Sequence, residues 1–234
     1  YSYILARCDA DGRNLYLLST ASEPEWLPTL LHDGRVIFSR WEYIDKALWR
    51  IQSLWTSRQD GTRGETFWGN QSVWPDHLAE ARPIPGSDRV MFTGTAHHNW
   101  FAGSIGILDP NQGRNFPQGL TKVTADVAWP ECGTPPSDPV EAADYHIAGK
   151  YDAYQTPYPL SEEDFLVSAR RDGKFRLYLM DVHGNRELIY EGAHHASVPV
   201  ALPTVPTSPA TGPVGLAAPR TTATVSAAGT PTPH

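Results

Sequence analysis

The chain has 234 residues, 40% of them hydrophobic and 11% aromatic, which is enough for a sizeable core and excludes a wholly disordered chain. The formal charge of −7 comes from 19 basic and 26 acidic side chains without a dense basic run, so we expect no nucleic-acid partner. The 19 glycines and 21 prolines are typical of short strands joined by tight turns. No apolar run approaches the roughly 20 residues of a membrane helix, so no membrane span is expected.

The first and last strands predicted along the chain belong to incomplete sheet units. Two strands at 3–7 and 14–20 are joined by the turn DADGRN, and a strand at 197–202 opens a further unit. The chain begins at Tyr1 with neither an initiator methionine nor a signal-like segment, which indicates an excerpt of a longer reading frame.

Between these ends, one phrase recurs three times: an apolar strand opened by a turn signal, a polar loop, and a second apolar strand. The copies are DGRVIFSRWEYIDKALWRIQSLWTSRQDGT from Asp33, GSDRVMFTGTAHHNWFAGSIGILDPNQG from Gly86 and EEDFLVSARRDGKFRLYLMDVHGN from Glu162. Recurring sheet units must stack, because each is too small to bury both of its faces. We therefore predict an all-β fold, a partial β-propeller.

Each copy of the phrase supplies strands B and C of a blade whose strands A to D run outward from the axis. The first full blade is expected at 26–31, 35–39, 48–55 and 65–69. The second is expected at 80–84, 89–94, 104–109 and 120–124. The third contains strands at 165–169, 175–181 and 186–190. At about 40 to 45 residues per blade, the chain holds about three full four-stranded antiparallel blades and two partial ones.

Two parts of the chain are expected to lie outside the blades. Residues 126–159 form a segment longer than an ordinary connection and are predicted to be a surface insertion within a propeller segment of 1–202. Residues 203–234 are rich in Ala, Pro, Thr, Ser and Gly, with Arg220 as their one charged residue, and are predicted to be a disordered tail.

The predicted topology sends the loops from B to C and from D to the next A to one face, where the less generic residues gather. The candidate ligand-face residues are Arg40, Glu42, Tyr43, Asp45, His97, His98, Asn99, Trp100, His194 and His195. The opposite face receives ordinary turns, which contain Asp33, Asp88 and Asp109.

Each chemical interpretation of these candidates has an ordinary structural alternative. His97, His98, His194 and His195 could offer imidazole to a transition metal, but neighbouring residues in an extended chain point in opposite directions, so no metal site is assigned. A network of Arg40 with Glu42 and Asp45 that pins its loop is favoured over a ligand-binding cluster.

The aromatic residues are mostly expected in the core, with Trp41 and Trp100 left open as a sugar-stacking surface. No GxSxG, HExxH, Walker or GxGxxG motif is present. A carboxylate pair for glycoside cleavage, drawn from Glu42, Asp45 and Asp144, stays open.

Cys8 and Cys132 are the two cysteines, and two buried free thiols are favoured over a single disulfide. Neither cysteine lies in a CxxC or CxxCH motif, so we expect no thiolate metal cluster and no covalently attached haem in this segment.

Several strings in the chain resemble a known family. CDADGRNLYLLS, HDGRVIFSRWEYIDKALWRIQSLWTSRQDGT and DRVMFTGTAHHNWFAGSIGILD are similar to the propeller domain in the middle of the hydrazine synthase alpha subunit and related bacterial proteins, and DGKFRLYLMDVHGN is similar to TolB-type repeats. The resemblance extends from residue 3 to about 202 and implies an extracytoplasmic, periplasmic location. In the hydrazine-forming enzyme it implies haems attached through CxxCH motifs in flanking domains, so haem is expected here only if such domains supply it.

The sequence thus favours a non-catalytic scaffold or binding module that contacts neighbouring domains or partner subunits, with no cofactor of its own. One alternative is the propeller part of a multihaem redox enzyme similar to hydrazine synthase. A second is a glycan-binding or glycoside-cleaving propeller, so a small-molecule or glycan ligand stays open.

Overall fold

The fold is given by a computed structural model. It describes residues 3–42, 52–72, 74–97, 99–130, 145, 149–197 and 199. The described part of the chain is all-β, and it contains no helix long and apolar enough to span a membrane.

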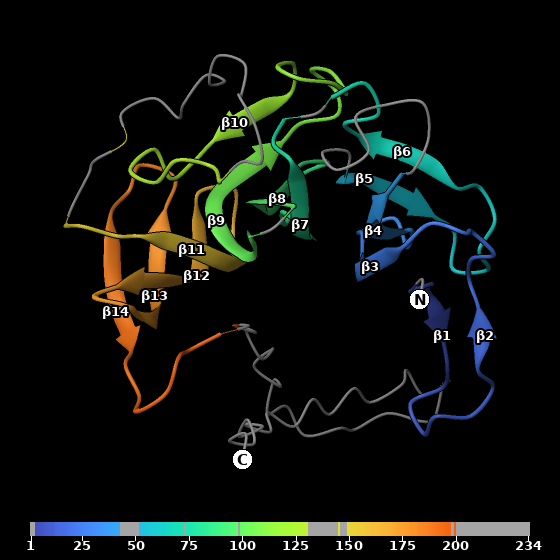
Figure 1. The fold of residues 1–234 in the computed structure, drawn as a ribbon, viewed down its shortest axis with the longest axis horizontal. Coiled ribbons are helices and arrows are strands. Elements are labelled where there is room, and N and C mark those ends of the chain that lie inside the picture. The colour runs from blue at the N-terminus through green and yellow to red at the C-terminus, as the bar shows by residue number, and fades with distance from the viewer. Residues whose placement is uncertain are drawn as a thin grey trace, which may run out of the picture. The chain divides into compact units, whose positions relative to one another are not determined.

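The strands form one hairpin and three sheet units (Figure 1). The hairpin pairs β1 (Ala6–Arg7) with β2 (Tyr16–Leu17). The first unit contains β3 (Glu25–Leu30), β4 (Val36–Trp41), β5 (Gln52–Ser57) and β6 (Glu65–Trp68). The second contains β7 (His77–Pro83), β8 (Val90–Ala96), β9 (Asn99–Leu108) and β10 (Leu120–Lys122). The third contains β11 (Ala153–Pro159), β12 (Asp164–Arg171), β13 (Lys174–Asp181) and β14 (Arg186–Tyr190).

Within each unit every strand pairs antiparallel with the next along the chain, and the turn residues explain the register. Arg171 pairs with Lys174 across the two-residue turn Asp172–Gly173, whose φ angles are 53° and 75°. Positive φ at both central residues defines a type I′ turn, which matches the twist of the flanking strands and for which Asp-Gly is a preferred sequence. The DG signal in the third repeat therefore fixes the β12–β13 hairpin.

The first strand of every unit carries a β-bulge at the same place. The pairing register shifts after Trp26 in β3, after Ala79 in β7 and after Gln155 in β11. The next residues are Leu27, Glu80 and Thr156, with φ angles of 54°, 55° and 52°. A bulge of this kind inserts one unpaired residue and bends its strand, so the three units share a detail that their sequences do not display.

The units are linked by short contacts between the third strand of one unit and the first strand of the next. Gln52 of β5 pairs in parallel with His77 of β7, and Tyr154 of β11 pairs with Gly103 of β9. Strand β7 also lies against β3 and β4, and β11 lies against β7 and β8.

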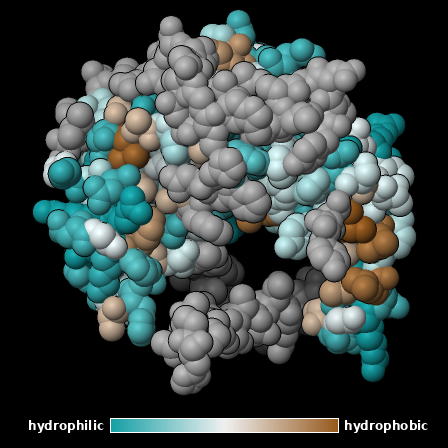
Figure 2. All heavy atoms as spheres, viewed as in Figure 1, coloured by the Kyte–Doolittle hydropathy of each residue, from teal (hydrophilic) through white to brown (hydrophobic). Residues whose placement is uncertain are grey.

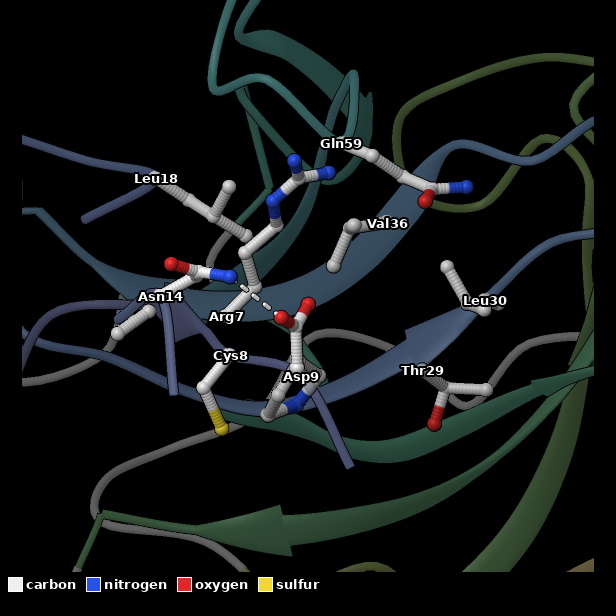
Figure 3. A pocket seen from close by; sticks show the side chains of 11 residues that line it. Arg7, Cys8, Asp9, Asn14, Leu18, Thr29, Leu30, Val36 and Gln59 are labelled. Atoms are coloured by element: carbon white, nitrogen blue, oxygen red, sulfur yellow. Dashed lines mark hydrogen bonds between the residues drawn. The ribbon is translucent and has the colours of Figure 1, made fainter. Parts of the chain in front are cut away.

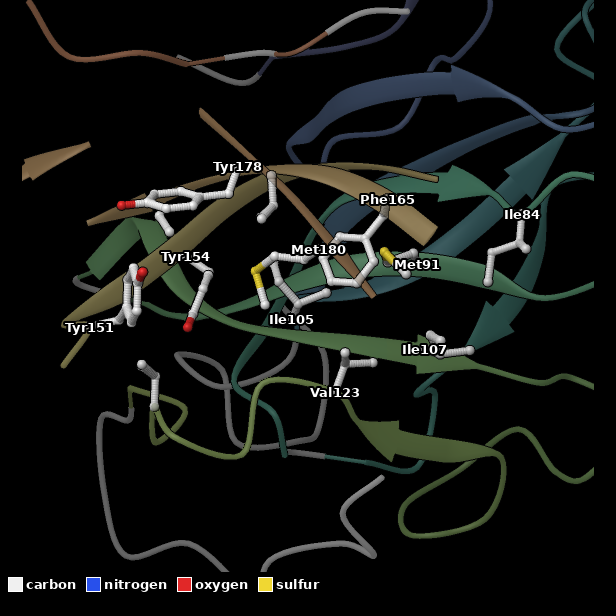
Figure 4. Packing of buried hydrophobic residues seen from close by; sticks show 13 residues of the cluster. Ile84, Met91, Ile105, Ile107, Val123, Tyr151, Tyr154, Phe165, Tyr178 and Met180 are labelled. Carbon is white, nitrogen blue, oxygen red and sulfur yellow. The ribbon is translucent and has the colours of Figure 1, made fainter. Parts of the chain in front are cut away.

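Three hydrophobic clusters fill the spaces between successive elements. The cluster between the second and third units is drawn in Figure 4 and includes Met91, Ile105, Tyr154, Phe165 and Met180. The cluster between the first and second units includes Ile37, Leu54, Trp68, Phe92 and Trp129. A smaller cluster of Leu5, Val36 and Phe38 lies between the hairpin and the first unit. The core is therefore divided among the interfaces, as stacked sheets require.

The hairpin remains partly uncovered. Leu15 and Leu17 are 71% and 52% exposed, and Figure 2 shows hydrophobic residues gathered over β1 and β2. Cys8, next to β1, is an exposed free thiol, which corrects the expectation of a buried one. The reason is that the described elements pack against the hairpin mainly from the side of the first unit.

The expected surface insertion at 126–159 requires a second correction. Its last seven residues are β11, the first strand of the third unit, and Trp129 and Tyr151 are also buried. The bulge at Thr156 and two prolines interrupt the alternation by which a strand is recognised in sequence. Residues 131–144, Cys132 and the predicted tail at 203–234 lie outside the described residues.

Candidate functional site

A row of side chains crosses from the first unit to the second at one end of the strands. The backbone register aligns Trp41 of β4, Gln52 of β5, His77 of β7 and Thr95 of β8. We call these four residues the polar row. Strands β4 and β8 end here, and β5, β7 and β9 begin here, so the row lies where the loops from B to C and from D to A were expected.

His77 is the most enclosed member of the row, with 1% of its surface exposed. Trp26 donates its indole N–H to His77 Nε2 over 3.0 Å, and His77 Nδ1 lies 2.8 Å from Thr95 Oγ1. An indole nitrogen only donates, so Nε2 accepts and the neutral ring donates from Nδ1 to Thr95. Burial, followed by the neighbouring His97, lowers the pKa of His77 to about 3. The ring is therefore neutral at pH 7 and holds its neighbours in place.

His97 and Trp41 form the more accessible part of the same site. His97 Nδ1 lies 2.9 Å from Gln52 Nε2, and the rings of His97 and Trp41 meet edge to face with centroids 4.5 Å apart. His97 follows β8 and Glu42 follows β4, so the two sequence candidates lie at one end of the units, as the loop assignment required.

Gln52 is 1% exposed, yet its Oε1 has no hydrogen-bond partner among the described residues. Exchanging the amide oxygen and nitrogen would move the vacancy to the nitrogen, so one end stays unpartnered in either orientation. A buried unsatisfied polar group costs about 1–3 kcal/mol. The Gln52 amide therefore has one bonding position that no described residue fills.

Two buried carboxylates stand beside the polar row. Glu42 is 6% exposed and follows Trp41 directly, and Asp76 is 0% exposed and directly precedes His77. Asp76 and Gln52 were not among the sequence candidates. Glu42 was selected because it lies in a loop from B to C. Asp76 lies in a connection from D to A, which was expected at the same face, so the same criterion would have selected it.

Arg40 is on the other side of the sheet from Trp41, because successive residues of a strand point to opposite faces. Its Nη1 is 3.6 Å from Glu25 Oε1, and its guanidinium lies 4.7 Å from the centre of the Trp55 ring. The expected network of Arg40 with Glu42 and Asp45 is therefore corrected for the described residues: the ion-pair partner of Arg40 is Glu25. Asp45 lies outside the described residues.

The remaining candidates are dispersed or not described. His194 and His195 are exposed, and the backbone N–H of Phe175 donates to His195 Nδ1 over 3.1 Å within the third unit. The described residues contain no group of three His, Cys, Asp or Glu side chains that could hold a metal ion. Tyr43, His98 and Asp144 lie outside the described residues, and the side chains of Asn99 and Trp100 are not described.

A second polar cluster, unpredicted from the sequence, lies between the second and third units. The Arg186 and Asp126 side chains are 4% and 5% exposed, with Nη1 3.4 Å from Oδ2. Tyr145 and Tyr154 each donate a hydroxyl to Asp126, over 2.6 and 2.7 Å, and each accepts from Arg186, over 2.9 and 2.6 Å. The Tyr151 ring lies 4.4 Å from the guanidinium carbon.

We call this group the Asp126–Arg186 cluster. Burial raises the pKa values of Tyr145 and Tyr154, so both remain protonated donors at neutral pH. Its members use one another's polar atoms, which indicates a structural role. Asp126 and Tyr145 stand on either side of residues 131–144, so the cluster ties both flanks of that segment to β11 and β14.

Two cavities at the ends away from the polar row are lined by charged groups, several of which are paired. One of about 490 Å³ is lined by Arg35 and Arg89, which bind Glu65 and Glu162 over 2.9 and 2.7 Å. The other, about 480 Å³ and shown in Figure 3, contains Asn14 and Asp9, joined by a hydrogen bond of 2.6 Å. Neither is lined by a buried polar atom of the described residues that lacks a partner.

No protein-family model matches the chain, and a search of curated proteins gives no match. Among solved structures, the chain is similar to hydrazine synthase from Kuenenia stuttgartiensis, with a TM-score of 0.58 and 17% sequence identity. The similarity covers 77% of this chain and 21% of that chain, so this chain spans about a fifth of its neighbour's length. At this identity the similarity concerns the fold alone, and it supports a distant structural relationship.

Proposed function

We propose that the chain is part of a β-propeller that works as a non-catalytic scaffold and binding module. The three sheet units would be blades, and the β1–β2 hairpin would be the outer half of another. Three features support this assignment: the same strand order in each unit, the same bulge in each first strand, and hydrophobic clusters placed between the units. The fold similarity to hydrazine synthase agrees with it.

The ligand site we assign is the polar row together with His97. The observation that carries this assignment is Gln52, a buried side chain with one amide end that no described residue satisfies, next to the half-buried rings of Trp41 and His97. The amide favours a neutral polar ligand, and the two rings offer it an aromatic contact. Binding is favoured over catalysis because the pKa of His77 is about 3, too low for a general base near neutral pH.

The scaffold part of the proposal rests on the loops at the same end of the units. The Asp126–Arg186 cluster fixes the flanks of residues 131–144 without using any atom of the polar row. A rigid base of this kind suits a connection that contacts neighbouring domains or partner subunits, because functional loops are usually displayed from a fixed scaffold.

The binding proposal is tested with a thermal-shift panel of amides, polyols and monosaccharides, together with a glycan array. At least one neutral polar compound should raise the melting temperature of the wild type, and Gln52→Leu should abolish that shift. Gln59→Leu is the matched control, because Gln59 is exposed and bonds only to the Gly34 carbonyl among the described residues. The proposal fails if no compound shifts the wild type, or if both variants behave alike.

A further inference from the structure

The crevice between the β1–β2 hairpin and the first unit contains a third cavity, of about 460 Å³. Residues 16–21 of the hairpin side form one wall, and residues of the turn after β5 form the rim. Leu5 and Phe38 supply a buried apolar wall, with 5% and 3% of their surfaces exposed. The cavity lies on the opposite side of β4 from the polar row, so it is independent of the function proposed above.

Among the polar residues that line this cavity, Glu25 and Arg40 form an oppositely charged pair, and Asp60 is bonded to Thr62. Glu25 is 3% exposed. Among the residues that the structure describes, neither Glu25 Oε2 nor the buried Arg40 Nε has a hydrogen-bond partner. The 3.6 Å between Arg40 Nη1 and Glu25 Oε1 exceeds the roughly 2.7–3.2 Å of a hydrogen bond. The pair therefore stands slightly apart, with one acceptor and one donor unused.

Burial makes both vacancies costly. It raises the pKa of Glu25, and a hydrogen bond with Ser19 and the charge of Arg40 offset part of that rise. Buried polar groups without partners are rare in native structures, where a water or a ligand usually satisfies them. This cavity is far larger than the roughly 30 Å³ of one water, and its volume falls within the approximate 300–1,000 Å³ of ligand pockets.

We propose that this cavity binds a free α-amino acid with an apolar side chain. The ligand's ammonium group donates to Glu25 Oε2, and its carboxylate accepts from Arg40 Nε. Such a zwitterion carries the missing donor and the missing acceptor on the same α-carbon, and its binding leaves the net charge of the site unchanged. Its side chain lies against Leu5 and Phe38, which removes further apolar surface from water.

The first test is calorimetric titration of the wild-type chain with L-leucine. 4-Methylpentanoate lacks the ammonium group and 3-methylbutylamine lacks the carboxylate, so each leaves one buried group unsatisfied. Each analogue should bind at least about tenfold more weakly than leucine. Equal binding of the three compounds, or no leucine binding at millimolar concentration, would overturn the proposal.

The second test uses substitutions that preserve shape. Glu25→Gln should weaken leucine binding at least about tenfold, and Arg40→Met should do the same, whereas the control Glu65→Gln changes an exposed carboxylate of the same unit. Gln52→Leu should leave leucine binding unchanged, which separates this site from the polar row. A crystal structure in saturating leucine that shows ordered water alone between Glu25 Oε2 and Arg40 Nε would refute the assignment, even if the variants fail to fold.

Discussion

Replacing Arg186 by methionine would leave the Asp126 carboxylate as an uncompensated charge in a nearly dry site. Both side chains are about one-twentieth exposed, and the guanidinium also donates to the hydroxyls of Tyr145 and Tyr154. Removing one partner of a buried ion pair costs about 3–5 kcal/mol. We expect a loss in this range in the free energy of unfolding, a large share of the roughly 5–15 kcal/mol that stabilises a typical domain.

Urea unfolding followed by circular dichroism measures this loss, and at about 2–4 °C per kcal/mol the melting temperature should fall by about 6–20 °C. Arg35→Met is the matched control, because Arg35 binds Asp33 and Glu65 at the surface, where such pairs contribute about 0–1 kcal/mol. Adding Asp126→Asn to Arg186→Met should recover part of the loss by removing the stranded charge. A single-variant loss no larger than that of Arg35→Met would refute the assignment of this cluster as a structural support.

Further predictions concern pH, the bulge and the tail. Because the folded-state pKa of His77 is about 3, against an ordinary histidine value of 6.5, the unfolded chain binds the proton first on acidification. The contribution of His77 to the free energy of unfolding should therefore be complete above pH 6.5 and fall by up to about 1.4 kcal/mol per pH unit towards pH 3. Thermal unfolding measured over this pH range would contradict the prediction if the melting temperature did not change, or if His77→Gln showed the same pH dependence as the wild type. Glu80 Oε2 accepts from Thr156 N over 2.7 Å and Thr93 Oγ1 over 2.9 Å. Glu80→Ala should thus cost about 1–3 kcal/mol in urea unfolding, and Glu80→Gln, which keeps an acceptor oxygen, should cost less. Limited proteolysis with mass spectrometry should remove residues 203–234 and leave a protected core, and a tail that survives digestion would be evidence against its predicted disorder.

The parts of the fold that were predicted correctly depend on local signals. The Asp172–Gly173 turn and the alternation on either side of it located β12 and β13, because turn chemistry and side-chain parity are properties of adjacent residues. Strand β11 was missed because its bulge and prolines break that parity. The all-β fold was predictable, but the first strands of the units were located unevenly: β3 to within one residue, β7 only in part and β11 not at all.

In the candidate site, too, local features were predictable and contacts between distant residues were not. Loop order was sufficient to place Glu42 and His97 at one end of the units. The partner of Arg40 depends on which face of β4 it occupies, and the pairing of Asp126 with Arg186 joins residues 60 positions apart. Neither contact leaves a pattern in a single sequence, because each is created when separate elements pack together.

Because the buried residues are divided among separate interfaces, the elements are not held together with equal strength. The hairpin meets the first unit through the small cluster of Leu5, Val36 and Phe38, whereas the second and third units share a larger apolar cluster, the Glu80–Thr156 hydrogen bond and the Asp126–Arg186 cluster. Under a mechanical load the hairpin would detach first, and the second and third units would separate last. The molecule thus has a compliant end and a stiff end, set by where its buried contacts are concentrated.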